Sequence, residues 1–285
     1  MDYILEVDGL NKEFDKFSLN NVSFKLEPGY IMGFIGANGA GKTTTIKLIM
    51  NLLKKDSGSI KVFGKDHIKY EKEIKDRIGF VYDESYFYEE LNIAQMTDIV
   101  APFYSEWDWE LYERYIKDFE LDSYKKIKKL SKGMKMKYSL ALALSHNADL
   151  IIMDEPTSGL DPVFRRLMLD ILYNIIQDEN KSIFFSTHIT TDLEKIADYI
   201  TFINKGEIVF SKTKDEVFDS YRVIKGGNEQ LSSEIKDKFI GIRNTNVGFE
   251  GLVEEQDGIA ELFQGDIIIE KPTLEDIMFY NIRGV

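Results

Sequence analysis

Residues 36–43 read Gly36-Ala37-Asn38-Gly39-Ala40-Gly41-Lys42-Thr43 and decide the fold of this 285-residue chain. They match the pattern Gly-x-x-x-x-Gly-Lys-Ser/Thr of a phosphate-binding loop. The motif follows a β-rich run, residues 30–35, and precedes a helical run, residues 44–53, which is the order that such a loop requires. The sequence therefore predicts a P-loop nucleotide-binding domain, and a glycine-rich turn that merely ends in Lys-Thr is the weaker interpretation.

The loop supplies the expected contacts to a nucleoside triphosphate. Its glycines let backbone N–H groups surround the β- and γ-phosphates, and the following helix adds partial positive charge at its N-terminus. Lys42 adds a full positive charge, and the hydroxyl of Thr43 is expected to ligate Mg²⁺. The expected ATP-binding residues are Asn38, Gly39, Ala40, Gly41, Lys42, Thr43 and Thr44.

A second chemical motif follows the apolar run at residues 150–153. A buried strand here carries Asp154 to the Mg²⁺ site that P-loop enzymes use. Glu155, one residue further, is the candidate base that takes a proton from the water attacking the γ-phosphate. The alternative is a strand that simply ends in two solvated carboxylates.

Composition argues against several classes of function. The hydrophobic fraction of 44% suffices for a full core, which we expect to form one large domain with an appendage. The formal net charge of -13 argues against nucleic acid as a partner, because such binding depends on clustered Lys and Arg. The chain has no cysteine, and its three histidines are too scattered to favour a metal centre. Without a signal-peptide pattern or a run of about 18 apolar residues, we expect a soluble, cytosolic protein.

Strand-like and helix-like runs alternate over the first two hundred residues, which predicts an α/β fold with a parallel or mixed sheet covered by helices. The expected strands are residues 4–7, 30–35, 78–82, 150–153, 182–186 and 200–203. Residues 84–147 show helical apolar spacing and many aromatics, and we interpret them as a helical subdomain inserted into the sheet domain. Those aromatics either fill a small core or face a partner.

The pattern changes after the hairpin-like Ile203-Asn204-Lys205-Gly206-Glu207-Ile208. Short strands and glycine-containing turns predict a small α+β appendage over residues 212–285, beside a main domain over residues 1–211. Thr273 and Asp276 have the spacing of a capping box at the start of a last helix. The appendage carries no chemical motif, so its role stays open between stability, dimer contact and regulation.

Leu130-Ser131-Lys132-Gly133-Met134 resembles the signature sequence of ATP-binding cassette (ABC) proteins. Ser158-Gly159-Leu160-Asp161 resembles the D-loop of that family, and Phe184-Phe185-Ser186-Thr187-His188 resembles its switch-histidine segment. The resemblance covers about residues 2–210, with the motifs in the family's order. It implies the ABC ATPase fold, with a P-loop sheet core and an inserted helical subdomain, and it implies hydrolysis of ATP with Mg²⁺.

The resemblance implies that two cassettes face each other across two ATP molecules. Ser131, Gly133 and Asp161 are then expected to contact the ATP that is held by the partner cassette. Asp161 also precedes Pro162, a pairing typical of a helix start, so a role as a helix cap alone is the alternative.

Two further roles follow from the resemblance. His188 is implied to touch the γ-phosphate as a catalytic residue beside Glu155. Phe14 occupies the place of the aromatic that stacks on adenine in this family, and its flat apolar face suits a purine. Stacking by Phe17 is the alternative, as is a plain core role for Phe14.

Three positions depart from the family's pattern. Lys132 and Met134 replace residues of the usual Leu-Ser-Gly-Gly-Gln, and Asp83 lies where relatives place a glutamine that bridges Mg²⁺ to the membrane partner. A carboxylate still ligates a hard cation, although it adds negative charge near the γ-phosphate. Asp83 is therefore expected as a metal ligand beside Thr43 and Asp154, in a functional but altered sensor.

The resemblance implies an ATPase subunit that powers a separate membrane-spanning permease. The signature variant, Asp83 and the terminal Pro272-Thr273-Leu274-Glu275-Asp276 resemble cassettes of bacterial ABC-2-type exporters. The expected partners are a second cassette, in a homo- or heterodimer, and a permease that contacts residues 82–90 and holds the chain on the inner face of the cell membrane. Two alternatives stay open: a soluble ABC ATPase acting on DNA or the ribosome, and a regulatory cassette that hydrolyses ATP weakly.

Overall fold

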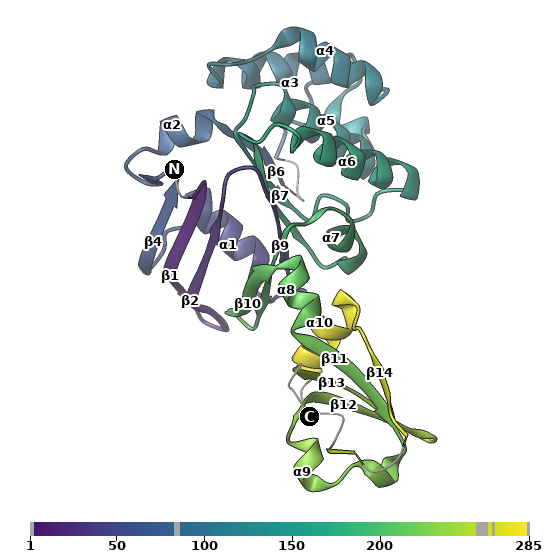
Figure 1. Ribbon diagram of the computed structural model, residues 1–285. Coiled ribbons are helices and arrows are strands. Elements are labelled where there is room, and N and C mark those ends of the chain that lie inside the picture. Colours follow the sequence, from purple (N-terminus) through teal and green to yellow (C-terminus); the bar gives the residue numbers. More distant parts are fainter. Residues whose placement is uncertain (1–2, 83–85, 255–261, 264–265, 284–285) are drawn as a thin grey trace.

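The strands form three sheets within residues 3–82, 86–254, 262–263 and 266–283, which are the residues that the computed structural model describes (Figure 1). The N-terminal sheet has the order β2-β1-β4-β5 and is antiparallel. Its strands are β1 (Leu5–Phe14), β2 (Phe17–Leu26), β4 (Ser57–Val62) and β5 (Lys65–Asp66). Every helix within the described residues is too short or too polar to span a bilayer.

The central sheet has the order β10-β9-β3-β8-β7-β6. Its strands are β3 (Ile31–Ile35), β6 (Ile78–Val81), β7 (Leu150–Asp154), β8 (Ser182–Thr187), β9 (Tyr199–Asn204) and β10 (Glu207–Thr213). All its pairings are parallel except the β9–β10 hairpin. Strands β3, β7 and β8 are buried along their whole lengths, which explains why their sequences are mostly apolar.

The order of the central strands positions the site. Strand β8 lies between β3 and β7, although the three strands are far apart in the sequence. Because they are parallel, their carboxyl ends meet at one edge of the sheet. This edge receives the phosphate loop after β3, Asp154 as the last residue of β7 with Glu155 directly after it, and His188 after β8. Ligands of open α/β sheets bind at such an edge.

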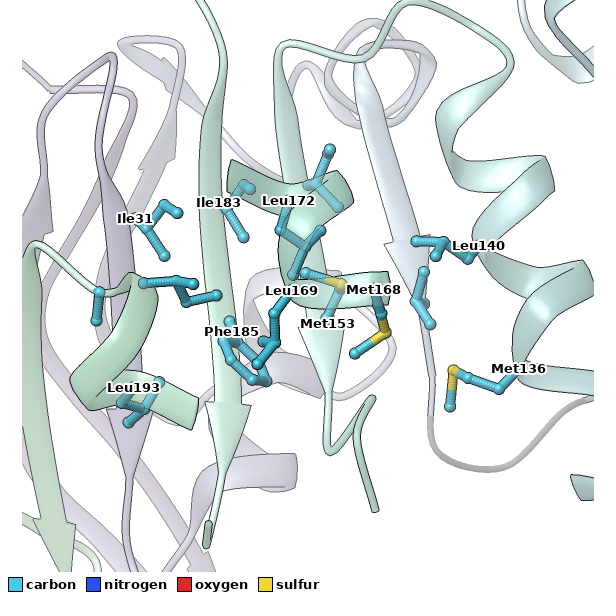
Figure 2. Close-up of a cluster of buried hydrophobic side chains, with 14 of the residues drawn as sticks. Ile31, Met136, Leu140, Met153, Met168, Leu169, Leu172, Ile183, Phe185 and Leu193 are labelled. Carbon is cyan, nitrogen blue, oxygen red and sulfur yellow. The ribbon is translucent and has the colours of Figure 1, made fainter. Parts of the chain in front are cut away.

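One hydrophobic core joins the central sheet to the helices on one of its faces (Figure 2). Ile31, Met153 and Phe185 point into this core from three neighbouring strands. The helices are α5 (Lys132–Leu144), α6 (Pro162–Ile175) and α7 (Thr190–Ile196). Gly33 on β3 permits the close approach of α7, because a Cβ atom there would lie 2.5 Å from Cδ2 of Leu193. The opposite face packs on α1 (Lys42–Ile49) and the N-terminal sheet.

A helical subdomain lies between β6 and β7 in the sequence and at the top of Figure 1. It contains α3 (Ile93–Val100), α4 (Trp109–Asp118), α5 and the short turns Ala101–Phe103 and Ile127–Lys129. The hydroxyl of buried Tyr138 on α5 lies 2.9 Å from Thr97 Oγ1 on α3, and burial raises the pKa of Tyr138. His146 stacks on Tyr104, and its Nε2 lies 3.1 Å from the carbonyl oxygen of Ile78 on β6. Burial lowers the pKa of His146. The contact of its ring with Ile78 ties the helical subdomain to the central sheet.

The C-terminal part forms the third sheet, below the others in Figure 1. Its strands, in the order β12-β13-β11-β14, are β11 (Tyr221–Gly226), β12 (Phe239–Thr245), β13 (Gly248–Glu254) and β14 (Ile268–Glu270). The helices here are α8 (Lys214–Asp219), α9 (Ser233–Lys236) and α10 (Leu274–Arg283). The sequence-based boundary between residues 211 and 212 falls inside β10, which pairs with β9 of the central sheet.

The predicted α/β class is confirmed, and each of the six predicted strands is present within one to several residues of its expected bounds. The two-residue turn between β9 and β10 has left-handed φ angles at Lys205 and Gly206, as the hairpin pattern predicts. Strands β2 and β4 were not predicted, although in β2 the buried Val22, Phe24 and Leu26 alternate with exposed Ser23 and Lys25. The capping box at Thr273 is present, since Asp276 N donates to its hydroxyl oxygen at 3.1 Å.

Candidate functional site

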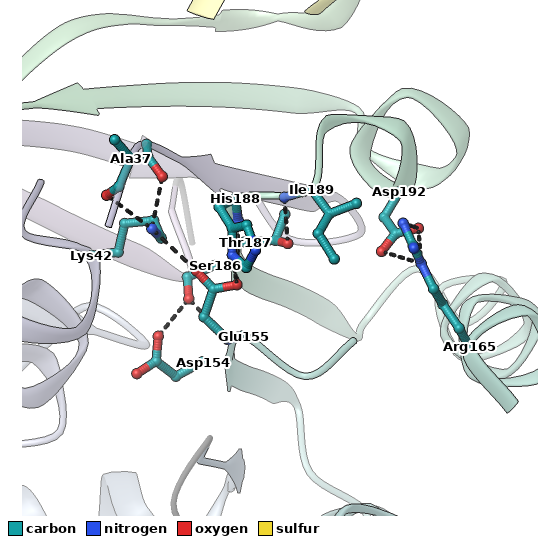
Figure 3. Close-up of polar contacts among 11 residues, drawn as sticks. Ala37, Lys42, Asp154, Glu155, Arg165, Ser186, Thr187, His188, Ile189 and Asp192 are labelled. Atoms are coloured by element: carbon teal, nitrogen blue, oxygen red, sulfur yellow. Dashed lines mark hydrogen bonds and ion pairs between the residues drawn. The ribbon is translucent and has the colours of Figure 1, made fainter. Parts of the chain in front are cut away.

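A cavity of about 660 Å³ opens at the edge where β3, β7 and β8 end. Figure 3 shows the polar side chains that these strands bring together there. The cavity is lined by Lys16, Phe17, Asn38, Gly39, Gly41, Lys42, Thr43, Thr44, Glu155, Ser158 and His188. It therefore gathers the predicted phosphate loop, the candidate base and the candidate switch histidine from three separate stretches of sequence.

The N-terminus of α1 faces this cavity without a side-chain cap. Its N-cap, Gly41, has a φ of 117° and no side chain that accepts a hydrogen bond. Side chains cap α3, α4, α5, α6 and α8, whereas α1, α2 (Glu71–Asp76) and α7 have no side-chain cap; of these three N-termini, that of α1 lines the cavity. The first N–H groups of a helix lack partners within the helix, and here an anion can accept from them.

Gly41 also has no room for a side chain. A Cβ atom at this position would lie 2.6 Å from Cδ2 of Leu19 on β2. The left-handed φ and this close contact both require glycine, which gives the last glycine of the phosphate-loop pattern a physical reason.

Lys42 is buried at the base of the cavity with 5% of its surface exposed. Its Nζ donates to the carbonyl oxygens of Gly36, at 2.7 Å, and Ala37, at 3.2 Å. The same ammonium lies 3.1 Å from Oε1 of Glu155 in an ion pair. A phosphate that enters the cavity would compete with the Glu155 carboxylate for this cation.

Glu155 links the lysine to His188. Its Oε2 lies 2.7 Å from Nδ1 of His188, so its two carboxylate oxygens face two different partners (Figure 3). The backbone of Glu155 is left-handed, with a φ of 49°. Such a backbone is unfavourable for a non-glycine residue and persists where the surroundings hold it, often at active sites.

Asp154 lies beneath the cavity with 1% of its surface exposed. One of its oxygens accepts a hydrogen bond of 2.6 Å from Oγ of Ser186. The carboxylate of Asp154 and the hydroxyl of Thr43 are hard oxygen ligands of the kind that Mg²⁺ prefers. No cluster of three His, Cys, Asp or Glu that could hold a metal occurs in the described residues. Asp154 and Thr43 are the described residues that would hold a cation, and the phosphate oxygens of a nucleotide would be further ligands.

The residues expected to act on a partner's ATP lie elsewhere. Ser131 is the N-cap of α5 and accepts from Met134 N at 3.2 Å. Asp161 is the N-cap of α6 and accepts from the backbone N–H groups of Val163 and Phe164. Local capping thus accounts for both side chains in a single chain. Gly133 lies near the D-loop-like segment, since a Cβ atom there would be 3.9 Å from Leu160.

Two of the predicted ATP-binding residues, Phe14 and Ala40, lie outside the cavity lining. Phe17 lines the cavity, whereas Phe14 is 41% exposed and stacks on Phe17 from outside the lining. Ala40 is buried within the loop and does not line the cavity. Asp83 lies outside the described residues. Its predicted role as a metal ligand stays a prediction.

Sequence reasoning missed Ser186 and the lining residues Lys16 and Ser158. Ser186 is one residue of a buried apolar strand, and nothing in the sequence tells which strand lies beside it. Its proximity to Asp154 follows only from the pairing of β7 with β8.

Comparison with known proteins agrees with this geometry. The family described as "ABC transporter" matches residues 19–158, and a family described as "AAA domain, putative AbiEii toxin, Type IV TA system" matches residues 126–191. The bacitracin transport ATP-binding protein BcrA of Bacillus licheniformis is 30% identical over 268 residues, which span 92% of this chain and 86% of that protein.

Two solved structures resemble this one. An ATP-binding subunit of an ABC transporter is 28% identical with a TM-score of 0.69, covering 75% of this chain and 91% of that chain. The ATP-binding cassette MJ0796, a dimer in a post-hydrolysis state bound to ADP and Pi, is 21% identical with a TM-score of 0.65. It covers 73% of this chain and 98% of that chain, and at this identity the likeness concerns the fold alone. The 30% identity to BcrA over most of both proteins, together with the match to the ABC transporter family, shows that the chain belongs to the ABC transporter ATP-binding proteins, a family of ATPases.

Proposed function

We propose that this chain binds Mg²⁺ and ATP in the cavity at the end of β3 and hydrolyses ATP as one of two facing cassettes, to drive a membrane permease. The observation that carries the proposal is the ion pair of Lys42 with Glu155 at the uncapped N-terminus of α1. A cation, free helix N–H groups and a carboxylate with a histidine beside it are the parts that phosphoryl transfer to water needs.

Different residues of the chain bind the phosphates, activate the water and hold the metal ion in this proposal. The α1 N-terminus and Lys42 bind the phosphates, which frees the Glu155 carboxylate from the ammonium. Glu155 then accepts the proton of the attacking water, and His188, held through Nδ1, faces the γ-phosphate through its other nitrogen. Thr43 and Asp154 would hold Mg²⁺, with Asp83 as a further expected ligand, and the ion would supply positive charge to the phosphate oxygens.

The partner cassette completes the site in this proposal. Ser131, Gly133 and Asp161 of each chain contact the ATP that is held by the other chain. Their positions at the N-termini of α5 and α6 support this role, because helix N-termini attract phosphate. The dimeric ADP-bound cassette of similar fold supports the two-cassette arrangement.

An apolar cavity of about 560 Å³ supports the permease as a second partner. It lies between the end of α1, β6 and the helical subdomain, and Leu52, Phe80, Tyr82 and Phe87 are among the residues that line it. A helix of a permease would fill such a groove. The similarity to a protein named for bacitracin transport supports a role in transport. Export is the expected direction, and the permease is expected to hold the chain on the inner face of the cell membrane.

The substitution Glu155→Gln tests the hydrolysis and the dimer together. Losing the base should lower the ATPase rate by about 10²-fold or more, while ATP binding persists and holds two chains together. The measurements are steady-state ATPase rates and size exclusion with ATP and Mg²⁺. The matched control is Glu179→Gln, because Glu179 is exposed and lies outside the cavity lining.

The outcomes separate the alternatives. An E155Q chain that stays monomeric with ATP and Mg²⁺ speaks against a homodimeric sandwich. A wild-type chain without measurable turnover supports the regulatory cassette instead. Crosslinking in native membranes identifies the permease, whereas recovery with ribosomes or DNA supports the soluble alternative.

A further inference from the structure

Ser186 on β8 contacts both carboxylate residues of the site (Figure 3). It pairs in register with Asp154 on β7 and with Phe34 on β3, and it is fully buried. Its Oγ donates to Oδ1 of Asp154 at 2.6 Å and accepts from the backbone N–H of Glu155 at 3.2 Å. One hydroxyl therefore joins the expected metal ligand to the expected base.

The chemistry of a hydroxyl allows this double contact. A serine hydroxyl has one hydrogen to donate and two lone pairs to accept with. The hydrogen goes to a buried carboxylate, and a short bond to an ionised acceptor is among the stronger hydrogen bonds in proteins. This bond restricts the rotation of the Asp154 side chain and thereby orients its carboxylate.

The second contact acts on the backbone of Glu155. Its N–H donates both to Oγ of Ser186 and, at 3.1 Å, to the carbonyl oxygen of Ser186. The left-handed backbone at Glu155 directs its carboxylate toward Lys42 and His188. The hydrogen bonds from Ser186 help to hold this unfavourable conformation.

We propose that Ser186 is a positioning residue that orients Asp154 toward Mg²⁺ and holds the backbone turn that aims Glu155. This inference rests on the proposed function, in which Asp154 ligates the cation and Glu155 is the base. Partners that hydrogen-bond to a metal ligand usually change metal affinity or activity by about 10-fold to 100-fold when removed.

The test compares Ser186→Ala with Ser182→Ala in the full chain. Both serines are fully buried on β8, but the hydroxyl of Ser182 contacts Gly29 N, at 3.0 Å, far from the carboxylates along the strand. Binding of Mn²⁺ to the chain with a non-hydrolysable ATP analogue is measured by electron paramagnetic resonance. We expect S186A to weaken Mn²⁺ binding by about 10-fold, to raise the Mg²⁺ concentration for half-maximal ATPase activity, and to lower kcat. S182A should leave all three unchanged, and S186T, which keeps the hydroxyl, should restore most of the loss.

Wild-type Mn²⁺ affinity and Mg²⁺ dependence in a folded S186A chain would overturn the proposal. Should S186A not fold, S186C gives the same comparison, because a thiol of similar size is only a weak donor. A wild-type chain that hydrolyses no ATP with Mg²⁺ contradicts the proposed function itself, so the two failures are distinguishable.

Discussion

Phe14 and Phe17 differ in how they meet the nucleotide cavity. Phe17 belongs to the cavity lining, and its ring lies 6.3 Å from that of Phe14 at an interplanar angle of 30°. Phe14 lies one ring further out, with Lys12 Nζ 5.5 Å from its centroid. A base that enters the cavity would meet Phe17 first, although the family resemblance assigns stacking to Phe14.

We predict that Phe17→Ala weakens ATP binding by about 10-fold, the value of one base–aromatic stacking contact of roughly 1.4 kcal/mol. Phe14→Ala is the matched control and should have a smaller effect, because Phe14 lies outside the cavity lining. Titration with a fluorescent ATP analogue measures both. The reverse order of effects would restore the stacking role to Phe14.

At the scale of elements, a buried ion pair joins α6 to α7. Nε of Arg165 donates to both oxygens of Asp192, at 2.8 and 3.0 Å, and Asp192 is fully buried. Helix α6 begins after Asp161, and α7 begins two residues after His188. The pair therefore fixes the helix that follows the D-loop-like segment against the helix that follows the switch histidine.

Replacing Arg165 by Leu should leave the Asp192 carboxylate buried without its cation. We expect a loss of about 3 kcal/mol in the free energy of unfolding, the lower end for a broken buried pair, since the guanidinium is partly exposed. Arg166→Leu, at the exposed neighbouring position, should change it by less than about 0.5 kcal/mol. Urea denaturation gives both values, and equal losses would show that the pair contributes nothing specific.

At the scale of the whole molecule, α10 ties the C-terminal sheet to the cassette. Leu274, Ile277 and Tyr280 belong to the same core cluster as the central sheet. The backbone N–H of Leu274 donates to Glu194 on α7 at 2.8 Å, and Tyr280 Oη donates to Glu250 on β13 at 2.7 Å. One helix thus contacts both parts of the chain.

Ile277→Ala should therefore destabilise the protein as a core substitution does. Ile277 is fully buried, and removing its side chain should lower the free energy of unfolding by about 2 to 4 kcal/mol. Ile268→Ala is the control, because Ile268 is 58% exposed on the edge strand β14. Urea denaturation measures both variants. Similar small losses in the free energy of unfolding would mean that the packing of α10 against the cassette contributes little to stability.

Much of the fold was predictable because its signals are local. The phosphate loop, the strand before it and the helix after it are contiguous, so the structure of residues 30–53 can be predicted from that segment alone. The helical subdomain and the buried strands are also predictable locally, because the spacing of apolar residues along the sequence differs between helices and strands. Family membership was predictable for the same reason, since each motif is a short uninterrupted segment.

The contacts between those segments depend on strand order, which no local pattern encodes. The sequence by itself determined the fold class, the phosphate loop and the residue types of the site. Only the tertiary structure placed β8 between β3 and β7, and this brought Ser186 to Asp154 and Glu155 to Lys42. The packing of the N-terminal sheet on the central sheet brought Phe17 on β2 to the cavity. The physical reason is that the spacing of apolar side chains indicates which face of a strand is buried. Which strand lies beside it depends on the packing of the whole core.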